Sequence, residues 1–142
     1  MFRTVPRSAL LLLVFALAAC DYGDGDGLIL DGTYRGSGQS QIATGTSPGF
    51  AQVDVTATFD EETVGALDAD VVVTVTAFGS PSETYSATVD GTLTGAGALS
   101  LDGLLTQGSL EFLFRLEGNA SANRIEGAMT GNLPVSNLVL TR

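Results

Sequence analysis

The side chains of this sequence that could do chemistry are carboxylates, hydroxyls and a single thiol. The chain has 142 residues with 16 Asp and Glu, one Cys and no His, and it contains neither Lys nor Trp. Without His and Lys, a Ser–His triad, a Schiff base and a histidine metal site are all excluded. Any catalysis would have to depend on carboxylates, and we therefore expect that the protein is not an enzyme.

Carboxylates are densest in residues 60–70, "DEETVGALDAD". Hard cations such as Ca²⁺ bind several oxygen ligands that one loop can bring together, and glycoside hydrolysis uses a pair of carboxylates. The spacing matches no calcium loop, however, and no Trp offers a platform for a sugar. We interpret the segment as a solvated acidic loop and expect no metal and no other cofactor. The weak metal candidates in this loop are Asp60, Glu61, Glu62, Asp68 and Asp70.

The thiol belongs to Cys20, which follows a basic and then apolar N-terminal segment. Arg3 and Arg7 precede the apolar run "ALLLLVFALAA" at residues 9–19. A membrane-spanning helix needs about 20 apolar residues, so this run is too short to be one. A basic flank, a short apolar core and small residues at its end are typical of a secretory signal peptide, which we expect over residues 1–19.

The end of this segment resembles the lipobox of bacterial lipoproteins. Leu17, Ala18, Ala19 and Cys20 follow the family's order of Leu, two small residues and Cys. The resemblance implies that the chain is cut before Cys20, that the sulfur carries lipid, and that the new N-terminus carries a fatty acid such as palmitate. One acyl chain holds a protein only marginally, whereas two or three hold it firmly. The alternative is an ordinary signal peptide cut near Ala19.

A short acidic and glycine-rich segment, "DYGDGDG", follows the cysteine. Glycine is costly to order, and the carboxylates of Asp21, Asp24 and Asp26 repel one another. We therefore interpret residues 20–27 as the lipidated Cys and a flexible tether. A calcium loop is the alternative, but position 12 counted from Asp24 is Arg35, where an EF-hand loop has Glu.

The lipobox and the tether together predict a protein of the bacterial cell envelope. It would be anchored by lipid to a membrane, with its domain outside the cytoplasm on the periplasmic face. The net charge of −10 argues against nucleic acid and anionic lipid surfaces, because both need basic patches. The expected partners are the membrane, through lipid on Cys20, and either a small apolar ligand or another envelope protein.

After the tether, apolar and polar residues alternate, which is typical of strands with one buried and one solvated face. Glycine-rich and polar segments, which favour turns, separate the alternating runs. The clearest strands are predicted at residues 50–59, 68–78, 85–93 and 110–117, and weaker ones at residues 28–36, 97–105, 123–131 and 136–142.

Eight antiparallel strands with short turns predict an all-β domain over residues 28–142, a small up-and-down β-barrel. A two-sheet β-sandwich is the alternative, because the sequence does not show whether the first and last strands pair. A membrane-spanning barrel is disfavoured, since the charged face would meet lipid. Glycines within the strands would permit the tight bending that closure needs; they are Gly32, Gly36, Gly91, Gly127 and Gly131.

The first predicted strand contains Gly32-Thr33-Tyr34, which resembles the Gly-x-Trp motif of lipocalins and related calycin barrels. In that family an Arg or Lys near the end of the last strand packs over the Trp. The resemblance implies that Tyr34 and Arg142 form a cation–π pair that closes one end of the barrel. The alternative is that Tyr34 is an ordinary core aromatic residue and Arg142 an exposed chain end.

The inward face decides between two non-catalytic functions. An eight-stranded barrel is either just filled by its side chains or holds one small ligand. We favour a filled or nearly filled core. The expected function is binding or structural, with a small apolar ligand as the first hypothesis; the alternative, for a filled core, is an interaction module such as an inhibitor or assembly factor. The residues predicted to face such a ligand are Phe59, Tyr85, Phe112, Phe114 and Met129.

Overall fold

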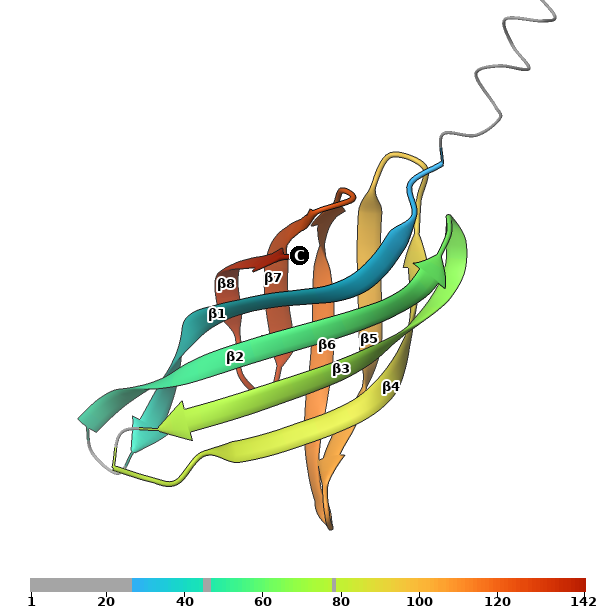
Figure 1. Ribbon diagram of the computed structural model, residues 1–142. Helices are drawn as coiled ribbons and strands as arrows, with labels where there is room; N and C mark the ends of the chain where they lie inside the picture. Colours follow the sequence, from blue (N-terminus) through green and yellow to red (C-terminus); the bar gives the residue numbers. More distant parts are fainter. Residues whose placement is uncertain (1–26, 45–46, 78) are drawn as a thin grey trace, which may run out of the picture.

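In a computed structural model the chain forms a closed, antiparallel, eight-stranded β-barrel (Figure 1). The structure describes residues 27–44, 47–77 and 79–142. Each strand pairs with the next along the chain, and β1 also pairs with β8. The prediction of an up-and-down barrel is thus confirmed over the sandwich. The strands are β1 (Leu30–Thr44), β2 (Ser47–Glu62), β3 (Gly65–Ala77), β4 (Glu83–Leu93), β5 (Ala98–Gln107), β6 (Leu110–Ala120), β7 (Arg124–Gly131) and β8 (Val135–Thr141).

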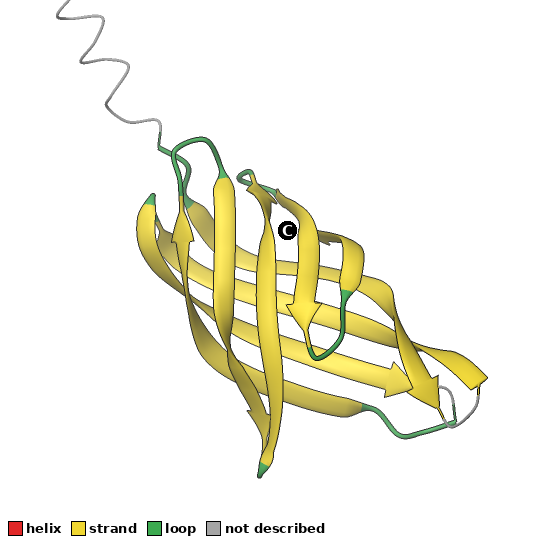
Figure 2. Cartoon of the chain, turned by 180° about the vertical axis from the view of Figure 1, so that it is seen from behind, coloured by secondary structure: helices red, strands yellow, loops and turns green. Residues whose placement is uncertain are grey.

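Seen from behind, the described part consists of strands joined by short turns, without helices (Figure 2). Accordingly, none of the described residues belongs to a helix long and apolar enough to cross a membrane. The alternation in the sequence explains the strands: in β3, Leu67, Ala69 and Val71 are buried while Asp68 and Asp70 are exposed. The buried side chains of all eight strands meet in one continuous hydrophobic cluster inside the barrel.

The barrel closes where β8 crosses β1. Arg35 lies opposite Thr141, and the backbones approach closely at Gly36, where an added Cβ would lie 1.9 Å from the carbonyl oxygen of Val139. Only a residue without a side chain fits there. Gly91 has a similar role between β4 and β5, because a Cβ at this position would lie 2.2 Å from a backbone oxygen of the neighbouring strand.

Two segments differ from the expectation. β1 continues to Thr44 and β2 begins at Ser47, so residues 37–44 and 47–49, which were not predicted as strand, belong to the first two strands. The predicted acidic loop over residues 60–70 is wrong, because β2 runs through Glu62 and β3 begins at Gly65. Asp60, Glu61 and Glu62 are the last three residues of β2, and Asp68 and Asp70 alternate with inward-facing residues of β3, so all five carboxylates lie on strands and not in a loop.

The barrel has two chemically different ends. Gly27, Arg142 and the turns that follow β2, β4 and β6 lie at one end, which we call the terminal end. The turns that follow β3, β5 and β7 lie at the other, which we call the far end. This division determines which of the predicted site residues can meet.

Candidate functional site

The residues of the predicted lipid anchor lie outside the described part of the chain. Leu17, Ala18, Ala19 and Cys20, as well as the tether up to residue 26, are among them. The described chain starts at Gly27, at the terminal end of the barrel.

The terminal end is closed by two aromatic side chains from β1 and β2. Tyr34 is fully buried, and its ring packs edge to face against Phe59 with the ring centres 5.5 Å apart. The Tyr34 hydroxyl donates a 2.7 Å hydrogen bond to the carbonyl oxygen of Ala122, in the turn between β6 and β7. Burial raises the pKa of Tyr34, and the charge of Arg142 opposes this rise.

Arg142 lies at the same end. A Cβ at Gly32 would lie 2.9 Å from the Arg142 Nε atom, and Gly32 has a φ of 94°, which favours glycine. The structure thus brings together Gly32, Tyr34 and Arg142, the residues of the lipocalin resemblance. The aromatic contact of Tyr34 is with Phe59, and stacking of the guanidinium on the Tyr34 ring stays a prediction.

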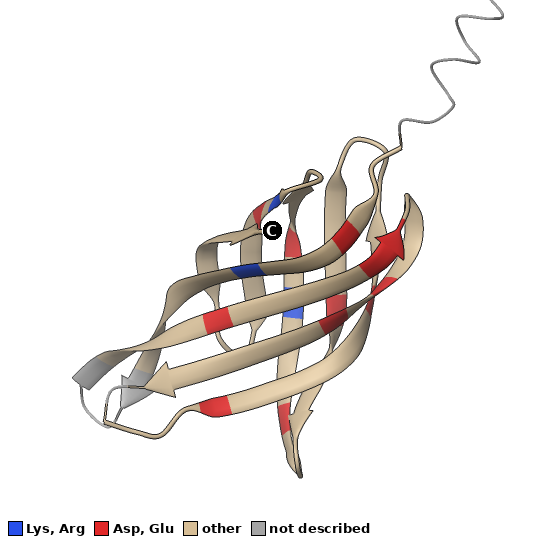
Figure 3. Cartoon of the chain, viewed as in Figure 1, with Lys and Arg blue, Asp and Glu red and all other residues tan. Residues whose placement is uncertain are grey.

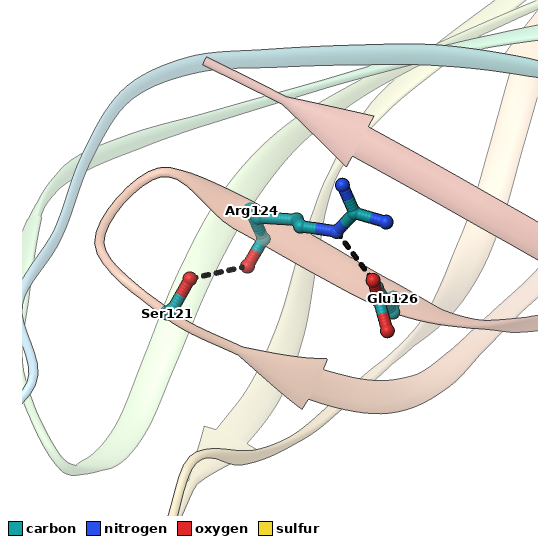
Figure 4. A network of polar contacts seen from close by, with 3 residues as sticks. All are labelled: Ser121, Arg124 and Glu126. Carbon is teal, nitrogen blue, oxygen red and sulfur yellow. Dashed lines mark hydrogen bonds and ion pairs between the residues drawn. The ribbon is translucent and has the colours of Figure 1, made fainter.

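A polar network holds the turn that accepts the Tyr34 hydrogen bond (Figure 4). The backbone N–H and the hydroxyl of Ser121 both donate to the carbonyl oxygen of Arg124, at 2.7 and 3.2 Å. Arg124 also pairs with Glu126 on the same strand. Because these side chains are exposed, the ion pair contributes little to stability. We infer that the network serves to fix the conformation of the turn.

The predicted ligand-facing residues are all buried inside the barrel. Phe114 and Met129 have no exposed surface and lie within the continuous core cluster. Phe59 packs against Tyr34 at the terminal end. Tyr85 and Phe112 border a hollow that opens to solvent, at the far end.

This far-end hollow has a volume of about 210 Å³. The Tyr85 and Phe112 rings in its wall lie 5.2 Å apart, tilted by 35°. The Tyr85 hydroxyl donates a 2.6 Å hydrogen bond to the Oε2 atom of Glu83. This bond, together with burial and the charge of Glu83, raises the pKa of Tyr85. The residues that line the hollow are Val75, Glu83, Tyr85, Phe112, Asn132 and Leu133.

Asn132 is held in place by β6. Its backbone N–H donates to the carbonyl oxygen of Leu113 at 3.1 Å, and its Oδ1 atom accepts from the Leu113 N–H at 2.9 Å. With the side-chain oxygen engaged in this way, the Asn132 amide NH₂ group is the part of the side chain that can serve a ligand. The far-end hollow therefore combines aromatic and aliphatic walls with one carboxylate and one amide.

Sequence reasoning missed Glu83 and Asn132. Glu83 precedes Tyr85 by two residues, and residues at this spacing share a face of a strand, so the pair could have been found. Asn132 follows β7 in a turn, and no sequence signal places that turn beside β4 and β6.

The acidic residues form a second hollow, of about 240 Å³, on the outer surface of β2, β3 and β4. Four of the five weak metal candidates line it, namely Asp60, Glu62, Asp68 and Asp70. Glu61 does not, and its backbone N–H donates a hydrogen bond to the Oδ1 atom of Asp31. In the ranges that the structure describes, no three acidic, His or Cys side chains are arranged to hold a metal ion.

A row of carboxylates crosses this acidic surface, and Figure 3 shows how far acidic segments outnumber basic ones. Asp68 lies opposite Asp90, which lies opposite Asp102 on β5. A hydrogen bond with Asp90 raises the pKa of Asp68, and partial desolvation and the neighbouring negative charges raise it further. Like charges that lie directly opposite destabilise a sheet, so the row costs stability.

Comparison with protein-family models, curated proteins and solved structures found no match to the chain. The resemblance to lipocalins therefore rests on Gly32, Tyr34 and Arg142 and on the eight-stranded barrel. Among the hollows of the described residues, the one at the far end combines a carboxylate and an amide with aromatic and aliphatic walls.

Proposed function

We propose that this protein is a lipid-anchored lipoprotein of the bacterial cell envelope, whose barrel binds a partner protein and catalyses no reaction. The sequence from Leu17 to Cys20, after a basic and apolar segment, supports the anchor. The absence of His and Lys from the sequence supports a non-catalytic role.

The burial of the inward side chains in one cluster is the observation that carries the choice of a protein partner. Pockets for drug-sized ligands have volumes of roughly 300–1,000 Å³, whereas the inward side chains of the described strands pack against one another in this cluster. The far-end hollow, at about 210 Å³, is smaller than such pockets. A partner that binds at the surface therefore suits the barrel better than a ligand enclosed in it.

The position of the anchor favours a partner at the far end. The segment from Asp21 to Gly27 can reach at most about 25 Å when extended, and Gly27 lies at the terminal end. With lipid on Cys20, the terminal end faces the membrane and the far end faces away from it. The far-end hollow is then accessible to other envelope proteins.

A small apolar ligand is the second candidate, because aromatic and aliphatic side chains line the far-end hollow. Native mass spectrometry of the protein, released from detergent in the gas phase, tests this candidate. A reproducible extra mass that is lost on denaturation would favour the small ligand. A clean mass after incubation with lipid extract would favour the protein partner.

The anchor is tested by Cys20→Ala in a bacterial host that lipidates such proteins. We expect the wild-type protein to be in the membrane fraction and to incorporate labelled palmitate. The variant should lose the label and leave the membrane fraction, because no acyl chain can attach. Ala18→Gly, which keeps a small residue in the lipobox, is the control and should behave like wild type. A Cys20→Ala protein that stays with the membrane contradicts the anchor.

A further inference from the structure

We propose that the far-end hollow binds the cationic side chain of a Lys or Arg on a partner polypeptide. This inference deepens the proposed function and rests on it, since it names the chemistry of the partner that the anchored barrel would bind. Size, wall composition, charge and the fixed amide of Asn132 all contribute to it.

The volume and the walls of the hollow fit one long side chain. At about 210 Å³ the hollow is too small for a typical organic ligand but large enough for one residue's side chain. Val75 and Leu133 offer aliphatic contacts, which suit the methylene stem of Lys or Arg. Tyr85 and Phe112 offer aromatic rings, and a cation within about 6 Å of such a ring is attracted to its face.

The charge of the hollow selects a cation. Glu83 lies in the wall, and the hydroxyl of Tyr85 fixes its Oε2 atom. None of the ion pairs found in the described part of the chain involves Glu83; they join Arg115 with Asp102 and Glu117, and Arg124 with Glu126. The chain as a whole carries a net charge of −10, which attracts cationic partners from a distance.

Asn132 favours a polypeptide over a free amine. Two hydrogen bonds with Leu113 fix Asn132 beside the hollow. Its amide NH₂ group can donate to a carbonyl oxygen, and the main chain of a partner supplies carbonyl groups next to the Lys or Arg side chain. A free alkylamine has the same cation but lacks this acceptor, so it should bind more weakly.

The test is calorimetric titration of the full chain, kept in phosphatidylcholine nanodiscs if it is membrane-bound. The probe is the capped pentapeptide Gly-Gly-Lys-Gly-Gly, compared with the same peptide carrying norleucine in place of Lys and with n-butylamine. We expect the Lys peptide to bind at least tenfold more tightly than the norleucine peptide, which has a similar stem without the charge. We expect n-butylamine to bind at least threefold more weakly than the Lys peptide.

Two variants with the same change of charge locate the site. Glu83→Gln should reduce the affinity for the Lys peptide at least tenfold and leave the norleucine peptide unaffected. Glu111→Gln should stay within twofold of wild type, because Glu111 is exposed and lies outside the hollow. Tyr85→Phe, which keeps the ring and releases Glu83, should weaken binding about threefold. Circular dichroism establishes that each variant is folded.

Three results would overturn the inference. Equal affinity for the Lys and norleucine peptides would exclude a cation site. An equal loss in Glu111→Gln and Glu83→Gln would mean attraction by net charge alone. Binding of n-butylamine as tight as that of the Lys peptide would exclude a polypeptide as the occupant.

The proposed function fails on a different measurement. If Cys20→Ala stays with the membrane while the Lys peptide binds at Glu83, the anchor is wrong and the far-end site stands. If Cys20→Ala is released while no peptide distinguishes Glu83→Gln from wild type, the anchor stands and only the far-end site is wrong.

Discussion

Gly36→Ala should destabilise the barrel, because it adds a methyl group at the seam where β1 meets β8. The new Cβ would lie 1.9 Å from the carbonyl oxygen of Val139, 2.8 Å from its carbonyl carbon and 2.9 Å from the Cδ2 atom of Leu140. Non-bonded carbon atoms are at their best separation at roughly 3.5–4.0 Å. The two strands must therefore move apart by about 1 Å or more to accept the methyl group.

The loss of stability in Gly36→Ala can be estimated from the cost of overpacking. Overpacking of a core costs roughly 1–3 kcal/mol. We expect the upper half of that range, because two of the three contacts are with backbone atoms that cannot change rotamer. In a domain of this size each 1 kcal/mol lowers the Tm by about 3–6 °C. The Tm of Gly36→Ala should therefore fall by roughly 6–18 °C.

Thermal unfolding followed by far-UV circular dichroism measures this change. Gly95→Ala is the matched control, because Gly95 lies in the turn between β4 and β5 with no atom within 4 Å of an added Cβ. The control should be within about 0.5 kcal/mol of wild type or slightly more stable, since Ala restricts the unfolded chain. Equal Tm values for the two variants would refute the close packing of β1 on β8.

Three further predictions concern charge and packing. Because the pKa of Asp68 is raised in the folded state, stability should increase as the pH falls through that pKa and decrease as it rises. Asp90→Asn should raise the Tm at neutral pH and reduce this pH dependence, and an unchanged pH profile of the Tm would contradict the pairing. Glu83→Gln should lower the pKa of Tyr85, followed through its ring resonances in NMR spectra, because a carboxylate acceptor is lost; a constant pKa would rule out that hydrogen bond. Phe114→Ala should cost about 3–5 kcal/mol in denaturant unfolding, and a loss below about 1 kcal/mol would mean that the interior is not filled.

The sequence was sufficient to predict the barrel because most strands have a strict apolar alternation. In β3 and β6 every second residue is buried over most of the strand. The first hairpin lacked this signal, since its inward positions include Gly38 and Ser40, and Ser40 is only 1% exposed. Small residues that are buried by close backbone packing do not differ in type from residues of a loop, so the strand boundary there could not be predicted.

Of the residues in the far-end hollow, the sequence predicted the two aromatic ones but not the carboxylate and the amide. Tyr85 and Phe112 belong to alternating strands, so their inward direction follows from period two. Their contact depends on the strand order around the barrel and on the relative lengths of the strands. The positions of Glu83 and Asn132 depend on the ends of β4 and β7, where alternation stops.

Each end of the barrel has a Tyr–Phe contact, but the two tyrosine hydroxyls have different hydrogen-bond acceptors. At the terminal end the Tyr34 hydroxyl is bonded to a backbone carbonyl, and its ring is fully buried. At the far end the Tyr85 hydroxyl is bonded to a carboxylate beside a hollow open to solvent. The carbonyl oxygen that accepts from Tyr34 carries no net charge, so it does not attract a cationic ligand. The carboxylate that accepts from Tyr85 carries a negative charge and can accept further hydrogen bonds from a ligand. This difference is why we place the partner at the far end and a structural role at the end where the described chain begins.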